Sequence, residues 1–195
     1  ISSTVSSCFF FFFQLRWGRN CLTSEAAKIL IASFVVSRLD YCNGLFWGLP
    51  RFQQSRLQSV FNAAAKLLLV GWKTDHVSPL LRRLHWLRVP ERIEYKICVS
   101  VFNALRGVAP SYLCELCRVD QIGGKRCTLR SAQSDAVNRL QLPLRRNRTG
   151  FGDRAFSSAG PSCWNSLPLE LRTETSVGSF RKLLKTHLFN RSFNT

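Results

Sequence analysis

Acidic residues are scarce in this sequence, and methionine is absent. Against 28 Lys and Arg there are 11 Asp and Glu in 195 residues, so the formal net charge is +17 and the isoelectric point is near 10.5. Such a charge opposes compaction through self-repulsion and usually has a polyanionic partner. Nucleic acid is the first candidate, and an anionic membrane surface is the second. Because the chain begins with Ile and contains no Met, we expect it to be part of a longer protein.

Long apolar runs are also missing. No segment reaches the roughly 18 apolar residues that a membrane span requires, so we expect no insertion into a membrane. The apolar run at residues 8–13 is not preceded by Lys or Arg, which is not typical of a signal peptide. Without a secretory signal, the eight cysteines are interpreted as reduced thiols, and we expect a nuclear or cytoplasmic protein.

The composition is that of a folded chain, and its apolar spacing is mainly helical. The hydrophobic fraction of 46% suffices for a core. We predict a helical bundle at residues 21–117, a basic loop or linker with short strands at 118–150, and a small helical C-terminal domain at 151–195. Residues 1–20 are predicted to be irregular, because five consecutive Phe fit neither helical nor strand alternation. A buried helix start is the alternative for this segment.

Four stretches carry the helical periodicity. The stretch "LTSEAAKILIASFVVSRLDYCNGLFWGLP" predicts a helix capped by Thr23 or Ser24, whose core face holds Ala27, Leu30, Ile31, Phe34, Cys42, Leu45 and Phe46. The next helix has a predicted core stripe of Leu57, Val60, Phe61, Ala64, Ala65 and Leu68. A third repeats apolar residues at Ile93, Ile97, Val101 and Leu105. The terminal helix places on one face Phe180, Leu183, Leu184, His187 and Leu188. Trp86 and Trp164 are interpreted as core residues.

Asp40, which precedes Tyr41, is the residue that most resembles part of a polymerase metal site. Two-metal phosphoryl transfer needs at least two converging carboxylates, and no other Asp or Glu lies within ten residues of Asp40. We therefore interpret Asp40 as a solvated or salt-bridged carboxylate. The sequence also lacks G-x-S-x-G, a phosphate-binding Gly loop and H-E-x-x-H. We predict that this chain is not an enzyme, has no catalytic residue and uses no cofactor.

Three cysteines offer a weak alternative metal site. Cys114 and Cys117 form a C-x-x-C pair, and Cys127 follows ten residues later. A structural zinc site normally has four ligands, and here neither a second pair nor a nearby His is present. We therefore predict buried or partly buried thiols and no metal, with a small zinc-binding structural module as the alternative.

Basic clusters are the positive functional signal. The first consists of Arg82, Arg83, Arg88 and Arg92, with His85 and Trp86 between them. The second consists of Arg145, Arg146 and Arg148, and the third of Arg181, Lys182 and Lys185. Clustered cations bind phosphates by releasing condensed counterions, and Arg beside exposed aromatic rings can stack on unpaired bases. These residues predict a surface that binds RNA or DNA, although a charged helix face can also be merely solvated.

Five blocks of the sequence resemble a known family. They are "LTSEAAKILIASFVVSRLDYCNGLFWGLP", "LQSVFNAAAKLLL", "DHVSPLLRRLHWLRVPERIEYKICVSVFNALRGVAPSYLCEL", "GFGDRAFSSAGPSCWNSLPLELR" and "SFRKLLKTHLF". In this order they resemble the C-terminal region of reverse transcriptases from LINE-type, non-LTR retrotransposons, in the jockey-like and chicken-repeat-like branch. The resemblance runs from about Val5 to Phe189.

The resemblance implies a thumb-like fold for the helical bundle up to about residue 117, followed by a small mixed domain of helices and short strands that binds RNA or target DNA. It implies a template–primer duplex as ligand and an upstream polymerase palm as the neighbouring domain. The family's catalytic Tyr-x-Asp-Asp lies in that palm and has no counterpart here, so no catalytic residue is transferred. The Phe run and the short "QLRWGRNCLTSE" depart from the family and indicate a decayed genomic copy. A translated relic without function is therefore a further alternative.

Overall fold

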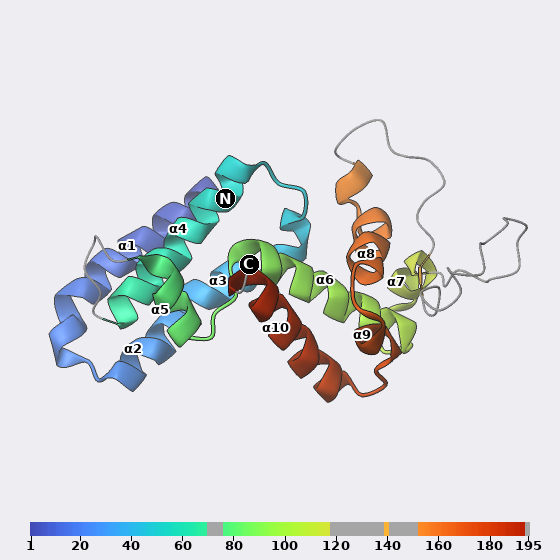
Figure 1. Cartoon of the computed structure of the whole chain (residues 1–195). Helices are drawn as coiled ribbons and strands as arrows, with labels where there is room; N and C mark the ends of the chain where they lie inside the picture. The colour runs from blue at the N-terminus through green and yellow to red at the C-terminus, as the bar shows by residue number, and fades with distance from the viewer. Residues whose placement is uncertain (70–75, 118–138, 141–151, 194–195) are drawn as a thin grey trace, which may run out of the picture. The chain divides into compact units, whose positions relative to one another are not determined.

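The computed structural model describes residues 1–69, 76–117, 139–140 and 152–193, apart from the side chain of Asn20. Over these residues the chain is mainly α-helical, as the sequence predicts (Figure 1). It divides into two compact units: unit 1 comprises residues 1–92 and 188–195, and unit 2 comprises residues 93–187. Helices α6 (Val89–Leu105) and α10 (Val177–Phe193) therefore each contribute residues to both units.

The predicted sequence segments are distributed differently over the units. Segments 21–117 and 151–195 each supply residues to both units. Most of segment 118–150 lies outside the described residues. No helix in the described part of the chain combines the length and apolar character needed to cross a membrane.

The N-terminal segment of unit 1 is a helix, and the prediction that it is irregular is wrong. Helix α1 (Ser2–Gly18) lies against α4 (Arg51–Leu68) and buries a stripe spaced at three or four residues, formed by Val5, Cys8, Phe12 and Leu15. In a run of five Phe every position is apolar, so the sequence does not reveal which face is buried. The partner helix selects Phe12 and leaves Phe9, Phe10 and Phe13 largely exposed.

The next helical stretch contains a π-helix. It consists of α2 (Ser24–Ile31), the π-helix η2 (Ala32–Val36) and α3 (Ser37–Asp40). The Thr23 hydroxyl accepts a hydrogen bond from the backbone N–H of Ala26 at 3.2 Å, which confirms Thr23 as the N-cap. A π-turn holds an extra residue per turn and therefore rotates everything that follows it relative to an α-helix.

Three burial predictions in this stretch are wrong, and the rotation accounts for the one at Phe34, since Cys42 and Leu45 lie beyond the end of α3. Val35 and Leu39 are buried, whereas the predicted core residues Phe34, Cys42 and Leu45 are exposed. Cys42 adopts a left-handed backbone conformation with φ of 49°, which ends the helix before the 3₁₀ turn η3 (Asn43–Phe46). Before the π-helix, the predicted burial of Ala27 and Ile31 is confirmed.

Helix α4 is regular, and its predicted stripe is confirmed in full. The buried residues are Leu57, Val60, Phe61, Ala64, Ala65 and Leu68. Polar side chains tie its flanks to other parts of unit 1. Gln58 Oε1 accepts a hydrogen bond from the Val89 N–H at 2.8 Å at the start of α6, and Arg19 Nε donates to the Leu67 carbonyl at 3.3 Å at the end of α4.

Unit 2 is built around three aromatic side chains. The rings of Phe102 and Phe180 stack with centroids 4.3 Å apart, and the Trp164 ring lies 5.8 Å from Phe180 and 6.4 Å from Phe102. Trp164 is 1% exposed, which confirms it as a core residue. Gly160 permits close approach of α8 (Phe156–Asn165), because a Cβ there would lie 3.1 Å from Val101 Cγ2.

Short helices complete unit 2. They are α7 (Ser111–Leu116), the 3₁₀ turn η5 (Gly152–Arg154) and α9 (Leu169–Thr173). On α10 the residues Phe180 and Leu184 are buried in this unit, as predicted, but Leu183 is 48% exposed. The Glu174 carboxylate just before α10 accepts hydrogen bonds from the backbone N–H groups of Ser176 and Thr175, and these bonds lower the pKa of Glu174.

Candidate nucleic-acid interface

The turn between helices α5 and α6 positions the first basic cluster. Helix α5 (Val77–Arg83) ends in a Schellman-type turn, in which His85 has a φ of 52° and the Trp86 N–H donates to the Leu81 carbonyl at 3.0 Å. Because a β-carbon makes this backbone conformation costly, a His at this position does not indicate a turn in the sequence. The turn directs the side chains of Arg82, Arg83 and His85 to the surface.

Aromatic residues of α10 lie beneath this turn. The Arg88 guanidinium lies 5.2 Å from the centre of the Phe193 ring, and Arg88 Nη2 donates a hydrogen bond to the Ser78 hydroxyl at 3.1 Å. The rings of His85 and Phe189 have centroids 5.7 Å apart. We refer to the surface formed by Arg82, Arg83, His85 and Arg88 as the α5–α6 basic turn. Three cations and two aromatic supports in one unit suit binding of a phosphate backbone.

Trp86 is only partly exposed and packs edge-on against Phe61, with centroids 6.0 Å apart. Its ring therefore contributes to the packing of unit 1, in agreement with its predicted role as a core residue. The α5–α6 basic turn thus takes its exposed aromatic character from His85 and its support from Phe189 and Phe193.

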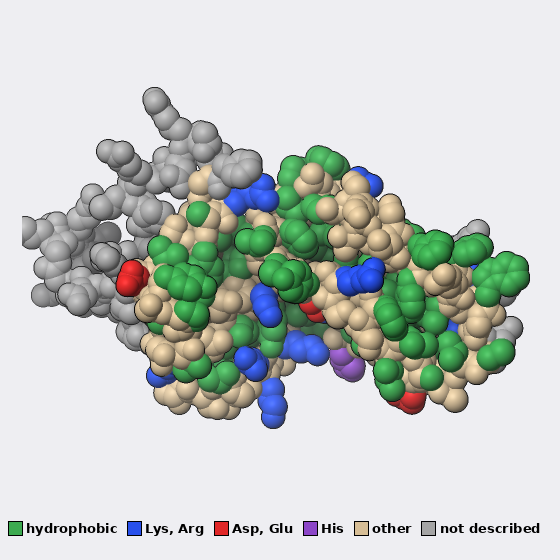
Figure 2. Space-filling view, turned by 180° about the vertical axis from the view of Figure 1, so that it is seen from behind, with side chains coloured by type: hydrophobic (Ala, Val, Ile, Leu, Met, Phe, Trp, Pro, Cys, Tyr) green, Lys and Arg blue, Asp and Glu red, His purple; other side chains and the backbone are tan. Residues whose placement is uncertain are grey.

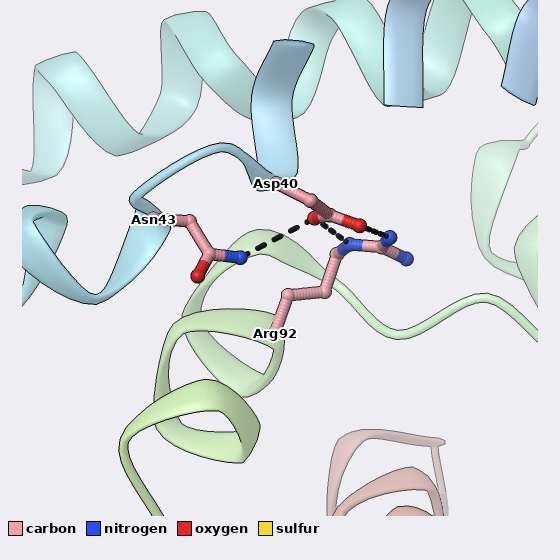
Figure 3. Close-up of polar contacts among 3 residues, drawn as sticks. All are labelled: Asp40, Asn43 and Arg92. Carbon is pink, nitrogen blue, oxygen red and sulfur yellow. Dashed lines mark hydrogen bonds and ion pairs between the residues drawn. The ribbon is translucent and has the colours of Figure 1, made fainter. Parts of the chain in front are cut away.

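Arg92, the fourth residue of the predicted cluster, has a different partner. Its guanidinium donates to both carboxylate oxygens of Asp40, from Nε to Oδ1 at 2.9 Å and from Nη2 to Oδ2 (Figure 3). The same guanidinium lies 4.6 Å from the centre of the Phe61 ring. Because its charge is already paired, Arg92 is omitted from the α5–α6 basic turn, and its binding to nucleic acid stays a prediction.

The Asp40–Arg92 pair confirms the interpretation of Asp40 as a salt-bridged carboxylate. The Asn43 amide also donates to Asp40 Oδ1, at 3.3 Å, and its own carbonyl oxygen is buried without a hydrogen-bond partner (Figure 3). In the part of the chain that the structure describes, no group of three or more His, Cys, Asp or Glu side chains could hold a metal ion. The geometry therefore assigns Asp40 to the joint between α3 and α6.

Acidic side chains barely offset the positive charge of unit 1. Over its described residues the acids are Glu25, Asp40 and Glu91. Glu25 pairs with Lys28 at 2.7 Å, and Asp40 pairs with Arg92. Two of the three carboxylates are therefore neutralised locally, and the described residues of unit 1 carry a net positive charge.

The third basic cluster lies on α10 in unit 2. Arg181, Lys182 and Lys185 are exposed, whereas Phe180 and Leu184 on the same helix are buried. This is the amphipathic arrangement that the sequence predicts, and it presents three cations over slightly more than one turn. The second cluster, Arg145, Arg146 and Arg148, lies outside the described residues.

The C-x-x-C pair forms a small thiol site in unit 2. Cys117 is 5% exposed, and its burial, followed by the proximity of Cys114, raises the pKa of Cys117 to about 11. Cys114 Sγ donates to the Ala109 carbonyl at 3.4 Å. Zinc binds thiolates, so zinc binding here would release the proton of Cys117. Cys127, the third member of the alternative zinc site, lies outside the described residues.

A second cation–aromatic surface in unit 1 was not predicted from the sequence. It is lined by α1 side chains together with Phe34 of η2 and Arg38 of α3. Because Phe34 was predicted to lie in the core, its spacing of four residues from Arg38 was not interpreted as a shared surface. That spacing places two side chains on one face of a helix and was the available signal.

Comparisons with family models, with curated proteins and with solved structures found no match to this chain. The resemblance to a reverse transcriptase region therefore stays a prediction from the five sequence blocks. Function has to be inferred from the side chains of the basic surfaces.

Proposed function

We propose that this chain is a non-catalytic module that binds RNA and DNA. The observation that carries the proposal is the α5–α6 basic turn, where Arg82, Arg83 and Arg88 gather in a unit with few unpaired acids. Binding would draw its affinity mainly from counterion release at phosphates. The exposed cations of α10 in unit 2 offer further phosphate contacts.

The five sequence blocks support a more specific origin. In this proposal the chain derives from the thumb and following region of a LINE-type retrotransposon reverse transcriptase, and the polymerase palm belongs to a preceding domain. Its ligand would then be a template–primer duplex or target DNA. The pairing of Asp40 with Arg92 agrees with a binding role, because a carboxylate used in this way does not present both oxygens to Mg²⁺.

Binding measured as a function of salt tests the proposal. Fluorescence anisotropy with labelled RNA and DNA should show affinity that falls steeply between about 50 and 200 mM salt. A plot of the logarithm of the binding constant against the logarithm of the salt concentration should have a slope of roughly −0.9 per neutralised phosphate. Arg83→Gln should reduce that slope by about one, because one phosphate contact is lost. Arg51→Gln is the matched control, since it removes an equal charge from an exposed position on α4. Absence of binding at low salt, or binding that salt does not weaken, contradicts the proposal.

A primer-extension assay tests the absence of catalysis. The purified chain, given template, primer, nucleotides and Mg²⁺, should extend no primer. Extension that disappears in Asp40→Asn would assign a catalytic role to this carboxylate and overturn the proposal.

A further inference from the structure

The surface between α1 and the π-helix forms a groove of about 530 Å³. Its lining includes Ser6, Phe10, Phe11, Gln14, Phe34 and Arg38. All of these residues belong to unit 1. Figure 2 shows hydrophobic side chains at the surface of the end of unit 1 that carries α1 and α2. The volume lies in the range of sites that hold small organic groups.

Aromatic rings form the walls of this groove. Phe11 and Phe34, which both line it, stack directly on each other with centroids 4.9 Å apart and planes 26° apart. Phe34 is 47% exposed and Phe10 is 64% exposed, so both keep ring surface open to solvent. The π-helix produces this arrangement, because it places Val35 and not Phe34 in the core. π-helical turns of this kind occur frequently at functional sites.

Polar groups give the groove a chemical preference. Gln14 offers an amide donor and an amide acceptor, Ser6 and Ser7 offer hydroxyls, and Arg38 offers a cation. Among the described residues that line the groove, none is acidic. Arg38 also acts on neighbouring Cys8: burial raises the pKa of that thiol, and the positive charge of Arg38 opposes the rise. A purely apolar partner would leave the amide and the guanidinium without a match.

We propose that this groove binds an unpaired nucleotide, with the base stacked on Phe34 and Phe10 and the phosphate held by Arg38. An aromatic face, hydrogen-bonding groups at the edge and a nearby cation are the three elements by which proteins hold single-stranded nucleic acid. Bases in a duplex are already stacked and cannot enter. This inference rests on the proposed nucleic-acid binding and adds a preference for single strands at this groove.

Paired binding measurements test the inference. Phe34→Ala and Phe10→Ala should each weaken binding of a labelled oligothymidylate by roughly 5- to 100-fold, the range of base–aromatic stacking. Binding of a duplex should change less than about twofold, because a duplex uses only its phosphates there. Arg38→Gln should weaken single-strand binding and make it less dependent on salt. Phe13→Ala is the control, since Phe13 is 63% exposed on the same helix and contacts Trp17 instead of the groove.

The outcomes separate this inference from the proposed function. If the wild-type chain binds neither single strands nor duplex, the proposed function itself is wrong. If it binds both and the two Phe variants match the wild type, only the groove assignment is wrong. Equal losses for single strand and duplex also overturn the assignment. Sedimentation tests the competing occupant: self-association of the wild type that Phe34→Ala abolishes would show that a second copy fills the groove.

Discussion

The two compact units use aromatic side chains in opposite ways. In unit 2, Phe102, Trp164 and Phe180 are buried against one another and form the core. In unit 1, large aromatic residues lie at the surface, including Phe10, Phe13, Trp17, Phe34, Tyr41 and Phe52. Its core consists mainly of aliphatic residues and alanines, and polar ties such as Asp40–Arg92 and Gln58–Val89 join its segments. Aromatic content alone therefore predicts neither a core nor a binding surface.

The largest expected effect concerns the aromatic core of unit 2. Trp164→Ala removes the largest fully buried side chain and leaves a cavity beside Phe102 and Phe180. We expect a loss of about 3–5 kcal/mol in the free energy of unfolding. Urea unfolding followed by far-UV circular dichroism measures it. A loss below about 1 kcal/mol would show that unit 2 does not depend on its aromatic cluster.

An intermediate effect is expected for the polar joint of unit 1. Asp40→Asn removes one partner of an ion pair in which the Arg92 side chain is 18% exposed and that of Asp40 is 37% exposed. Because the site is partly solvated, we expect a loss of about 1–2 kcal/mol, between the values for surface and buried pairs. A double-mutant cycle with Arg92→Gln isolates the coupling energy. Coupling near zero would mean that apolar packing alone holds this joint.

A pH-dependent effect is expected for the thiol of unit 2. Burial raises the pKa of Cys117 from 9.0 to about 11, so the folded chain favours the neutral thiol. The corresponding stability is complete below pH 9 and is lost as the pH rises through 11. Unfolding measured across this window should show a shallower decline for Cys117→Ala than for the wild type. If stability declined equally with pH in both proteins, a group other than Cys117 would be responsible for the decline.

The same pKa governs the reactivity of the thiols. At neutral pH a thiol with pKa near 11 holds about 100-fold less thiolate than one at 9.0. Iodoacetamide, followed by mass spectrometry, should therefore modify Cys117 after the exposed Cys21 and Cys42. Rapid modification of Cys117 would show that α7 opens readily.

The smallest stability effect is expected at the surface of unit 1. Trp17 is 80% exposed at the end of α1, so Trp17→Ala should change the free energy of unfolding by less than about 0.5 kcal/mol. The comparison with Trp164→Ala, measured in the same way, contrasts one residue type in two environments. Similar losses for both variants would remove the distinction between the units.

The sequence predicted best where one regular helix meets one partner. The α4 stripe from Leu57 to Leu68 follows the helical period throughout, so all six of its buried positions were predicted. Prediction failed after Ile31, because the π-helix shifts the register and exchanges Phe34 for Val35 in the core. No spacing rule identifies such an insertion from a single sequence.

The sequence predicted which of the candidate Arg residues lie close together, but not the partner of each one. The cluster at 82–92 was recognised from the density of Arg, and three of its Arg residues lie at the α5–α6 basic turn. Arg92 was grouped with them because it is near in sequence. Its actual partner, Asp40, lies 52 residues away, and only the fold brings the two together. The groove with Phe34 and Arg38 was not predicted, because the π-helix decides which side chains of this stretch are exposed.

One pair of hydrogen bonds in unit 2 fixes the backbone of a residue that belongs to no helix. The Asn165 side chain binds the backbone of Leu140 twice, accepting from its N–H and donating to its carbonyl, both at 2.9 Å. Leu140 is thereby anchored by an amide, as if by a neighbouring strand, and its side chain is buried. An amide side chain that both accepts from and donates to one residue reproduces the pairing of two strands, and it fixes the direction of that backbone as well as its position. Asn165→Asp would therefore keep an acceptor for the Leu140 N–H but lose the donor to its carbonyl, and Leu140 would hold one of these hydrogen bonds in place of two.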